Sequence, residues 1–168
     1  MTTNCKGLRV LLVGPYPPPF GGIASHLTML IPGLIQRGAE DVAVVSLTAG
    51  EDTVEQEEGA TIYRFNMRRH AHRLLFPKHW PIVISSLNEY VAMNMGARRL
   101  FIATLQALLV NEVARRHRSD VVSFYQSDSS FGMLPCSRLW GRSLGIVLTV
   151  FGECYDNHKF FAGRSALV

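Results

Sequence analysis

The sequence predicts an α/β fold built on an open, doubly wound parallel sheet. Short apolar runs, typical of strands covered on both faces, alternate along the chain with segments of helical periodicity. A loop rich in glycine and proline follows the first of these strands, at the sheet edge where such folds bind ligands. The chain has 168 residues, of which 48% are hydrophobic and 18% charged, which suits one globular domain with a buried core.

The first strand and the helix after it form the clearest pair. Residues 10–13 are an uninterrupted run of valine and leucine, as expected for a buried strand. Residues 23–35 carry apolar side chains at helical spacing, and Gly38 stands where a glycine commonly ends a helix. Pro32 lies inside this segment, so we expect a bend or a restart of the helix near Met29.

The next elements continue the alternation. Residues 41–47 repeat the buried-strand pattern and predict a second strand parallel to the first. The acidic stretch 51–58 is expected to be a solvated loop, and residues 61–65 a short strand near the sheet edge. Residues 88–117 predict a long helix that is broken at Gly96 and ends in a basic turn.

The last part of the chain predicts two further strands, at 120–125 and 145–151, with a helix over 133–140 between them. In a parallel sheet the carboxyl ends of the strands meet at one edge. Three loops are therefore expected to converge on one crevice: residues 14–22, 126–130 and 152–158.

The first of these loops is the best candidate for an anion site. Gly21 and Gly22 lack a Cβ, so a ligand can approach their N–H groups closely. A helix that begins at Ile23 adds unpaired N–H donors and a positive dipole end, which suit phosphate or diphosphate. The alternative is a tight turn that only connects strand to helix.

Three other residues are candidate ligand contacts. His26 lies one helical turn beyond the glycines, where it either faces the crevice or is packed or solvated. Asp128 and Glu153 fall on strand-end loops, where a carboxylate can bind or deprotonate a hydroxyl group but is more often only solvated. The residues alone assign no catalytic base.

Charge and cysteine usage exclude several classes of function. The formal charge of +4 is moderate, although cations cluster at 64–78 and 115–118, and no nucleic-acid motif is present. The three cysteines show no CxxC spacing, so neither a disulfide framework nor a zinc site is expected. His70, His72 and His79 lack a cysteine or carboxylate at ligand spacing, and we expect no metal.

A resemblance to a known family gives these candidates a common meaning. Residues 14–23 read GPYPPPFGGI and are followed by His26, then by Gly38 before the strand DVAVVSL. This order resembles the amino-terminal signature of glycosyltransferase family 4. The strand DVV at 120–122 and the segment LTVFGE at 148–153 are also similar to family strands, so the resemblance extends from residue 9 to about residue 153.

The resemblance implies the GT-B fold, in which two Rossmann-like domains face a cleft and transfer a sugar from a nucleotide-sugar with retention of configuration. Residues 1–168 would form an incomplete amino-terminal, acceptor-side Rossmann-like domain. The donor-binding domain is absent from this sequence, so the chain alone is expected to be inactive. The implied partners are a nucleotide-sugar donor and a glycan or lipid-linked acceptor of the cell envelope, with no nucleic acid.

In the family's mechanism Gly21 and Gly22 would touch the donor diphosphate, with no metal or other cofactor. One departure is that Phe151 stands where the family has a histidine that contacts the donor sugar. That contact is not carried over, because phenylalanine neither donates a hydrogen bond nor titrates. Phe151 is instead expected to form a wall of the sugar or acceptor site, and the neighbouring Gly152 is a further candidate substrate contact.

A basic segment with interleaved apolar residues follows at 68–80. Arg68, Arg69 and Arg73 alternate there with leucine, phenylalanine and tryptophan, as in segments that lie on an anionic membrane surface. The alternative is a solvated basic loop that covers the sheet edge. No signal-peptide pattern and no apolar run of membrane-spanning length is present, so we expect a cytoplasmic protein, peripheral at the inner face of the membrane.

Two other classes of function remain open from the sequence. The same crevice could serve a non-catalytic module that binds a phosphorylated metabolite. The basic segment could hold a scaffold protein on anionic lipid.

Overall fold

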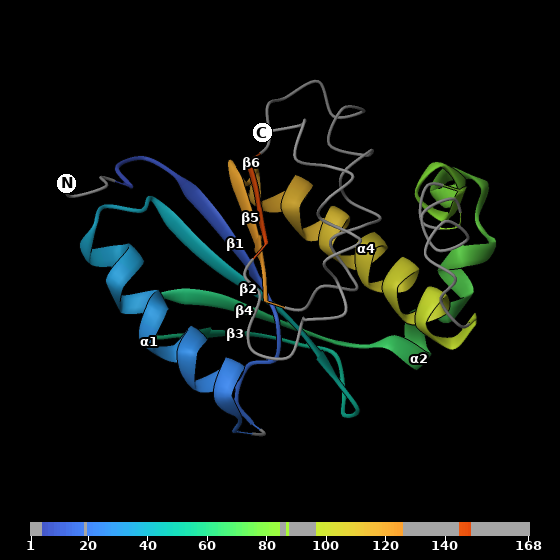
Figure 1. Cartoon of the computed structure of the whole chain (residues 1–168), viewed down its shortest axis with the longest axis horizontal. Coiled ribbons are helices and arrows are strands. Elements are labelled where there is room, and N and C mark those ends of the chain that lie inside the picture. The colour runs from blue at the N-terminus through green and yellow to red at the C-terminus, as the bar shows by residue number, and fades with distance from the viewer. Residues whose placement is uncertain (1–4, 19, 85–86, 88–96, 126–144, 149–168) are drawn as a thin grey trace, which may run out of the picture.

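The computed structural model describes residues 5–18, 20–84, 87, 97–125 and 145–148. Within them the chain forms a six-stranded sheet with helices on both faces (Figure 1). The strands are β1 (Arg9–Val13), β2 (Asp41–Thr48), β3 (Thr53–Glu57), β4 (Ala60–Asn66), β5 (Val121–Phe124) and β6 (Gly145–Leu148). The helices are α1 (Gly22–Gln36), α2 (Met67–His70), α4 (Ala97–His117) and the short 3-10 helices η1 (Ala71–Leu75) and η2 (Pro77–His79).

The strand order is β3-β4-β2-β1-β5-β6. Strand β1 pairs in parallel with both β2 and β5, β2 pairs in parallel with β4, and β5 pairs in parallel with β6. Only β3 among these strands runs antiparallel to its neighbour. The strands after β1 first add on one side of it, and the chain then crosses to the other side, where it forms β5 next to β1. The strand order therefore reverses between β1 and β5.

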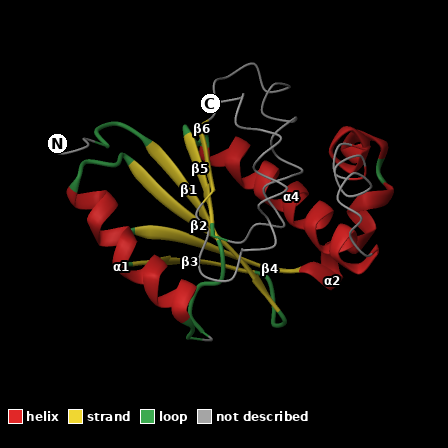
Figure 2. Cartoon of the chain, viewed as in Figure 1, coloured by secondary structure: helices red, strands yellow, loops and turns green. Residues whose placement is uncertain are grey.

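Alternating side chains of the central strands divide the core between two faces. Val10 and Leu12 of β1 pack with Leu27 and Ile31 of α1, in a cluster on one face. Leu11 and Val13 point to the other face and pack with α4. Figure 2 shows the sheet between these two helices. The predicted doubly wound α/β arrangement is therefore confirmed as an α/β sheet with both faces covered, which is compatible with a Rossmann-like architecture.

Helix α1 ends as the sequence predicts. The Arg37 N–H donates to the Gly33 carbonyl, and Gly38 follows with φ of +86°, a left-handed conformation that glycine adopts without steric cost. Of the two outcomes expected near Met29, a restart is wrong, because α1 runs as a single helix through Pro32, and a bend stays a prediction. Its cluster of buried side chains on the sheet holds both halves of the helix in place.

The acidic stretch expected to be a loop is instead an edge strand. Residues 53–57 pair antiparallel with β4, and a two-residue turn joins the strands. Glu58 and Gly59 have φ of 51° and 82°, the left-handed pair that suits a tight hairpin. Strand β3 is exposed along most of its length, so it carries no alternation of apolar residues for sequence reasoning to detect. Strand β4 lies next to this edge strand, in agreement with the expected position of residues 61–65 near the sheet edge.

The remaining predictions divide between confirmed and undescribed residues. The long helix is confirmed over Ala97–His117 and the two later strands over Val121–Phe124 and Gly145–Leu148. The expected break at Gly96 and the helix over 133–140 lie outside the described residues.

Candidate functional site

The candidate site lies at the carboxyl ends of β1 and β5, where the strand order reverses. In open α/β sheets this reversal leaves a crevice in which ligands bind, because the connections on its two sides diverge. The loop of residues 14–21 leaves β1 at this point and leads into α1. The sequence prediction of a site after the first strand therefore falls at the position that the topology favours.

Gly14 lets the loop leave the sheet in close contact with its neighbours. A Cβ at this residue would lie 3.1 Å from Tyr125 Cβ and 3.4 Å from Leu27 Cδ1. The Gly14 N–H donates to the Val45 carbonyl at 3.1 Å, and the Tyr125 N–H donates to the Val13 carbonyl at 2.8 Å. The loop, α1 and the end of β5 are thereby packed against one another.

The amino end of α1 has no protein partner for its first donors among the described residues. Gly21 is the N-cap residue, with extended backbone (φ −164°, ψ 172°), and it supplies no capping side chain. The first turn contains no acidic residue, and both Gly21 and Gly22 are exposed with open space where a Cβ would stand. The first N–H groups of a helix have no acceptor inside the helix, so these donors and the dipole suit an anion.

Ile23 and His26 occupy different surroundings on α1. Ile23 is half-buried and packs against the apolar cluster between α1 and the sheet, so its side chain fixes the first turn of α1 on the sheet. His26 is half-buried with its ring centroid 5.6 Å from that of Tyr125 at the end of β5. This contact places His26 at the strand reversal, next to the residue that closes β5.

Arg64 on β4 anchors the loop from below, and sequence reasoning missed this role. Its Nη1 donates to the Tyr16 carbonyl at 3.1 Å and its Nη2 to the Pro17 carbonyl. The guanidinium also lies 5.6 Å from the centroid of the Tyr16 ring, and its side chain is only 11% exposed. The sequence signal for this role is the single arginine inside the otherwise apolar strand TIYRF.

Tyr16 is the residue that this anchoring fixes most firmly. Its N–H donates to Ser46 Oγ at 3.0 Å, and the residue is buried on the α1 face of the sheet. Burial raises the pKa of the Tyr16 phenol, with further contributions from the charges of Glu57 and Glu58 that exceed the opposing effect of Arg64. Strands β2 and β4 therefore hold the loop that carries the glycines.

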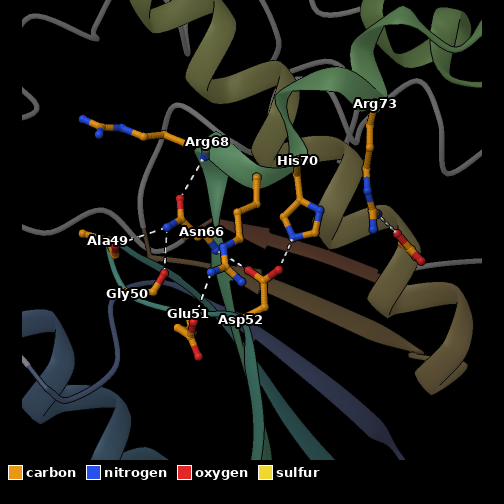
Figure 3. A network of polar contacts seen from close by, with 10 residues as sticks. Ala49, Gly50, Glu51, Asp52, Asn66, Arg68, His70 and Arg73 are labelled. Atoms are coloured by element: carbon orange, nitrogen blue, oxygen red, sulfur yellow. Dashed lines mark hydrogen bonds and ion pairs between the residues drawn. The ribbon is translucent and has the colours of Figure 1, made fainter.

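The basic segment after β4 begins at a second, polar corner of the same sheet edge (Figure 3). The Asn66 side-chain amide donates to the carbonyls of Ala49 and Gly50 at 3.1 and 2.7 Å, and its oxygen accepts from the Arg68 N–H at 3.0 Å. The Asn66 N–H donates to Asp52 Oδ1 at 2.7 Å. The loop between β2 and β3 is thus joined to the start of α2.

The cations of this segment differ in their partners. Arg69 pairs with Glu51 at 3.1 Å, and Arg73 pairs with Glu112 on α4. Buried His70 lies with Nε2 3.0 Å from Asp52 Oδ2 and meets the Phe65 ring edge to face. The exposed Arg68 side chain extends away from this network (Figure 3).

Large apolar side chains are exposed beyond these cations. Leu75 is 79% exposed and Trp80 53%, and Phe76, Ile84 and Leu87 are also exposed. Lys78 lies between them, with its ammonium 5.8 Å from the centroid of the Phe76 ring. The mixture of cations and apolar residues that the sequence indicates at 68–80 is therefore present on the surface.

The other predicted site residues, Asp128, Phe151, Gly152 and Glu153, lie outside the described residues. In the part of the chain that the structure describes, no group of three or more histidine, cysteine, aspartate or glutamate side chains is arranged to hold a metal ion. The same part contains no helix with the length and apolar character needed to cross a bilayer.

Comparison with known proteins gives no assignment. No protein-family model matches the chain, and no curated protein sequence matches it either. The site is therefore interpreted from its own residues and geometry.

Proposed function

We propose that this chain is the amino-terminal, acceptor-side domain of a retaining glycosyltransferase with the GT-B architecture. The single observation that carries the proposal is the uncapped amino end of α1, with its two exposed glycines, at the reversal of strand order. The resemblance of residues 14–23 to the family signature supports the same interpretation. The fold alone would not, because Rossmann-like sheets serve many unrelated functions.

In this proposal the first N–H groups of α1 bind the diphosphate of the nucleotide-sugar. Negative charge develops on the departing diphosphate as its bond to the sugar breaks, and fixed N–H donors stabilise that charge without reorganisation. Gly21 and Gly22 allow the phosphate oxygens to approach the backbone. A donor-binding domain would hold the nucleotide. A glycan or lipid-linked acceptor would bind on the amino-terminal domain that this chain forms.

Replacement of Gly22 tests the role of these amides. Gly22 is the first residue of α1, where proline is tolerated, and the extended Gly21 suits a residue that precedes proline. Gly22→Pro removes one donor and should weaken binding of a nucleoside diphosphate at least about tenfold, as expected for a hydrogen bond to a charged group. Gly22→Ala keeps the donor but places a Cβ in the open space where the ligand would approach, so its affinity should fall less than that of Gly22→Pro.

Titration calorimetry of the chain with uridine or guanosine diphosphate measures both variants. Equal affinities of Gly22→Pro and Gly22→Ala would contradict the proposed contact. Tight binding of a phosphorylated metabolite that is not a nucleotide by the chain alone would favour a non-catalytic binding module instead. Reading the gene beyond the codon for Val168 tests the expected donor-binding domain.

A second candidate function is docking on an anionic membrane surface. The observation that favours it is the group of exposed apolar side chains, including Leu75, Trp80 and Ile84, on the segment that carries Arg68 and Lys78. Amphipathic segments of this composition bury their apolar side chains at the headgroup boundary and place their cations among anionic lipids. Arg69 and Arg73 contribute less here because both pair with carboxylates of the chain.

Vesicle sedimentation tests this second function. The double variant Arg68→Ala/Lys78→Ala should weaken binding to phosphatidylserine vesicles at least about tenfold, since each cation near such a surface contributes about 1 kcal/mol. Trp80→Ala should weaken binding at high salt as well, because its contribution is apolar. Arg37→Ala, an exposed cation at the end of α1, is the matched control. Equal binding by all variants would contradict membrane docking.

A further inference from the structure

A cavity of about 600 Å³ lies between η1, η2 and the second half of α4, apart from the end of β1. Side chains from both sides line it: His72, Arg73, Phe76, Lys78 and His79 from the basic segment, and Leu108, Asn111, Glu112, Arg115 and Arg116 from α4. The proposed function uses none of the α4 residues. Two segments well separated in the sequence therefore build one concave surface.

The charge of this cavity is strongly positive. Among the described residues that line it, four permanent cations (Arg73, Lys78, Arg115 and Arg116) face one carboxylate, that of Glu112. Arg73 and Arg116 both bind Glu112, one at each carboxylate oxygen. The carboxylate therefore fixes two guanidinium groups in place and leaves an excess of positive charge in the cavity.

His79, which lines the cavity, has a pKa that burial and these cations lower. Burial lowers the pKa of His79, and the charges of Lys78 and Arg73 lower it further, against a smaller opposing effect of Glu112. The other titratable side chains of the lining are His72 on η1 and the arginines of α4. A bound anion would offset the cations and raise the pKa of His79, which gives the site its own spectroscopic signal.

The lining of the cavity also contains apolar and neutral polar groups. The Phe76 ring meets His72 edge to face, and Leu108 of α4 lies in the lining. Asn111 also lines the cavity, and its Oδ1 is buried with no hydrogen-bond donor among the described residues. This oxygen is inaccessible to solvent, so the lining meets a ligand through its cations and apolar side chains.

We propose that this cavity is a second anion site, which binds a phosphate or diphosphate group. A phosphate group carries about −1.5 to −2 charges at neutral pH, so phosphate and diphosphate match the excess of cations better than a single carboxylate does. Guanidinium groups bind such oxygens through paired N–H donors. The site does not depend on the amides of α1 and stands whether or not they bind a donor diphosphate.

The first experiment titrates the intact chain with inorganic pyrophosphate and follows the ring resonances of His79 by NMR over a range of pH. Saturation should raise the His79 pKa. Lys78→Gln/Arg115→Gln should weaken binding at least about a hundredfold, as expected for loss of two hydrogen bonds to a charged group. Arg37→Gln removes one exposed cation elsewhere and should have no effect. An unchanged His79 resonance, or equal weakening by Arg37→Gln, would overturn the proposal.

The second experiment identifies the source of the phosphate. Vesicles of phosphatidylcholine with and without phosphatidic acid are compared as ligands for the wild-type chain and for Arg115→Gln. Binding that requires phosphatidic acid and Arg115, and that pyrophosphate displaces, assigns the site to a lipid headgroup. Pyrophosphate binding without vesicle binding assigns it to a soluble phosphate, and the absence of both overturns the proposal.

The readouts separate this proposal from the proposed function. Gly22→Pro should leave the His79 response to pyrophosphate unchanged, and Lys78→Gln/Arg115→Gln should leave the amide resonances of residues 22–25 responsive to nucleoside diphosphate. Failure at one site therefore does not imply failure at the other.

Discussion

At the scale of single residues, Arg64 has the largest structural role relative to its sequence signal. Its guanidinium donates to two loop carbonyls, lies near the Tyr16 ring and pairs with Glu55 on β3 at 3.5 Å. An arginine can do this because its planar group presents several donors at fixed angles. The loop that precedes α1 is therefore held by a side chain from a strand two positions away in the sheet.

Replacement of Arg64 should destabilise the protein. Arg64→Ala leaves the Tyr16 and Pro17 carbonyls without their charged donors and should lower the free energy of unfolding by roughly 2–3 kcal/mol. Arg64→Lys keeps the charge but not the fork, so we expect an intermediate loss. Arg68→Ala, on an exposed side chain, should change stability by at most about 0.5 kcal/mol. Urea unfolding measures all three, and equal effects of Arg64→Ala and Arg68→Ala would refute the anchoring role.

At the scale of elements, sequence reasoning succeeded where a strand or helix is buried on a recognisable face. Strands β1 and β2 have uninterrupted apolar runs because both faces are covered by helices. Strand β3 could not be predicted from its pattern because it is an exposed edge strand with polar residues. The overlooked signal was Gly59, because glycine favours the left-handed second position of a tight hairpin turn.

Two glycine replacements test the conformation of these elements. Gly59 has φ of +82°, and an added Cβ would lie 2.9 Å from Ile35 Cδ1. Gly59→Ala should therefore lower the free energy of unfolding by about 1–2 kcal/mol. Gly33 lies inside α1 with nothing within 4 Å of an added Cβ, so Gly33→Ala should raise it by roughly 0.5–1 kcal/mol. Thermal or urea unfolding checks both signs, and a neutral Gly59→Ala would contradict the hairpin geometry.

At the scale of the whole molecule, a partly buried polar network joins four elements at the amino ends of the strands, opposite to the candidate site. Arg9 on β1 bonds to Asp41 at the start of β2, and its N–H donates to Asp120, the residue before β5. His117 at the end of α4 lies with Nε2 3.2 Å from Asp41 Oδ2 and its Nδ1 2.8 Å from Ser119 Oγ. The side chain of His117 is only 3% exposed.

This network makes stability depend on pH. Burial lowers the pKa of His117, and this effect exceeds the opposing attraction of Asp41. Below the ordinary histidine value of about 6.5 the unfolded chain takes up a proton that the folded protein resists, so stability falls as pH decreases. The free energy of unfolding should decrease less steeply from pH 7.5 to pH 5 in His117→Gln than in the wild type. Parallel slopes in urea unfolding would refute this prediction.

The candidate site was predictable only in part. The loop and the two glycines could be located because a strand-to-helix junction is local in sequence, and the structure places that junction at the reversal of strand order. The anchoring by Arg64, the His26–Tyr125 contact and the α4 side of the cavity join residues far apart in the chain. Such juxtapositions depend on the pairing of whole strands, which local patterns do not encode.

The anchoring of the loop by Arg64 also has a thermodynamic consequence for ligand capture. A loop whose carbonyls already accept hydrogen bonds loses little conformational freedom when a ligand binds. Binding therefore costs less entropy than it would for a flexible loop. Arg64 lies on β4, and β4 pairs with β3. The β3–β4 hairpin therefore helps to hold the loop that leads into α1. A substitution in the turn of this hairpin would then weaken binding of the proposed ligand, although the substituted residue does not contact the ligand.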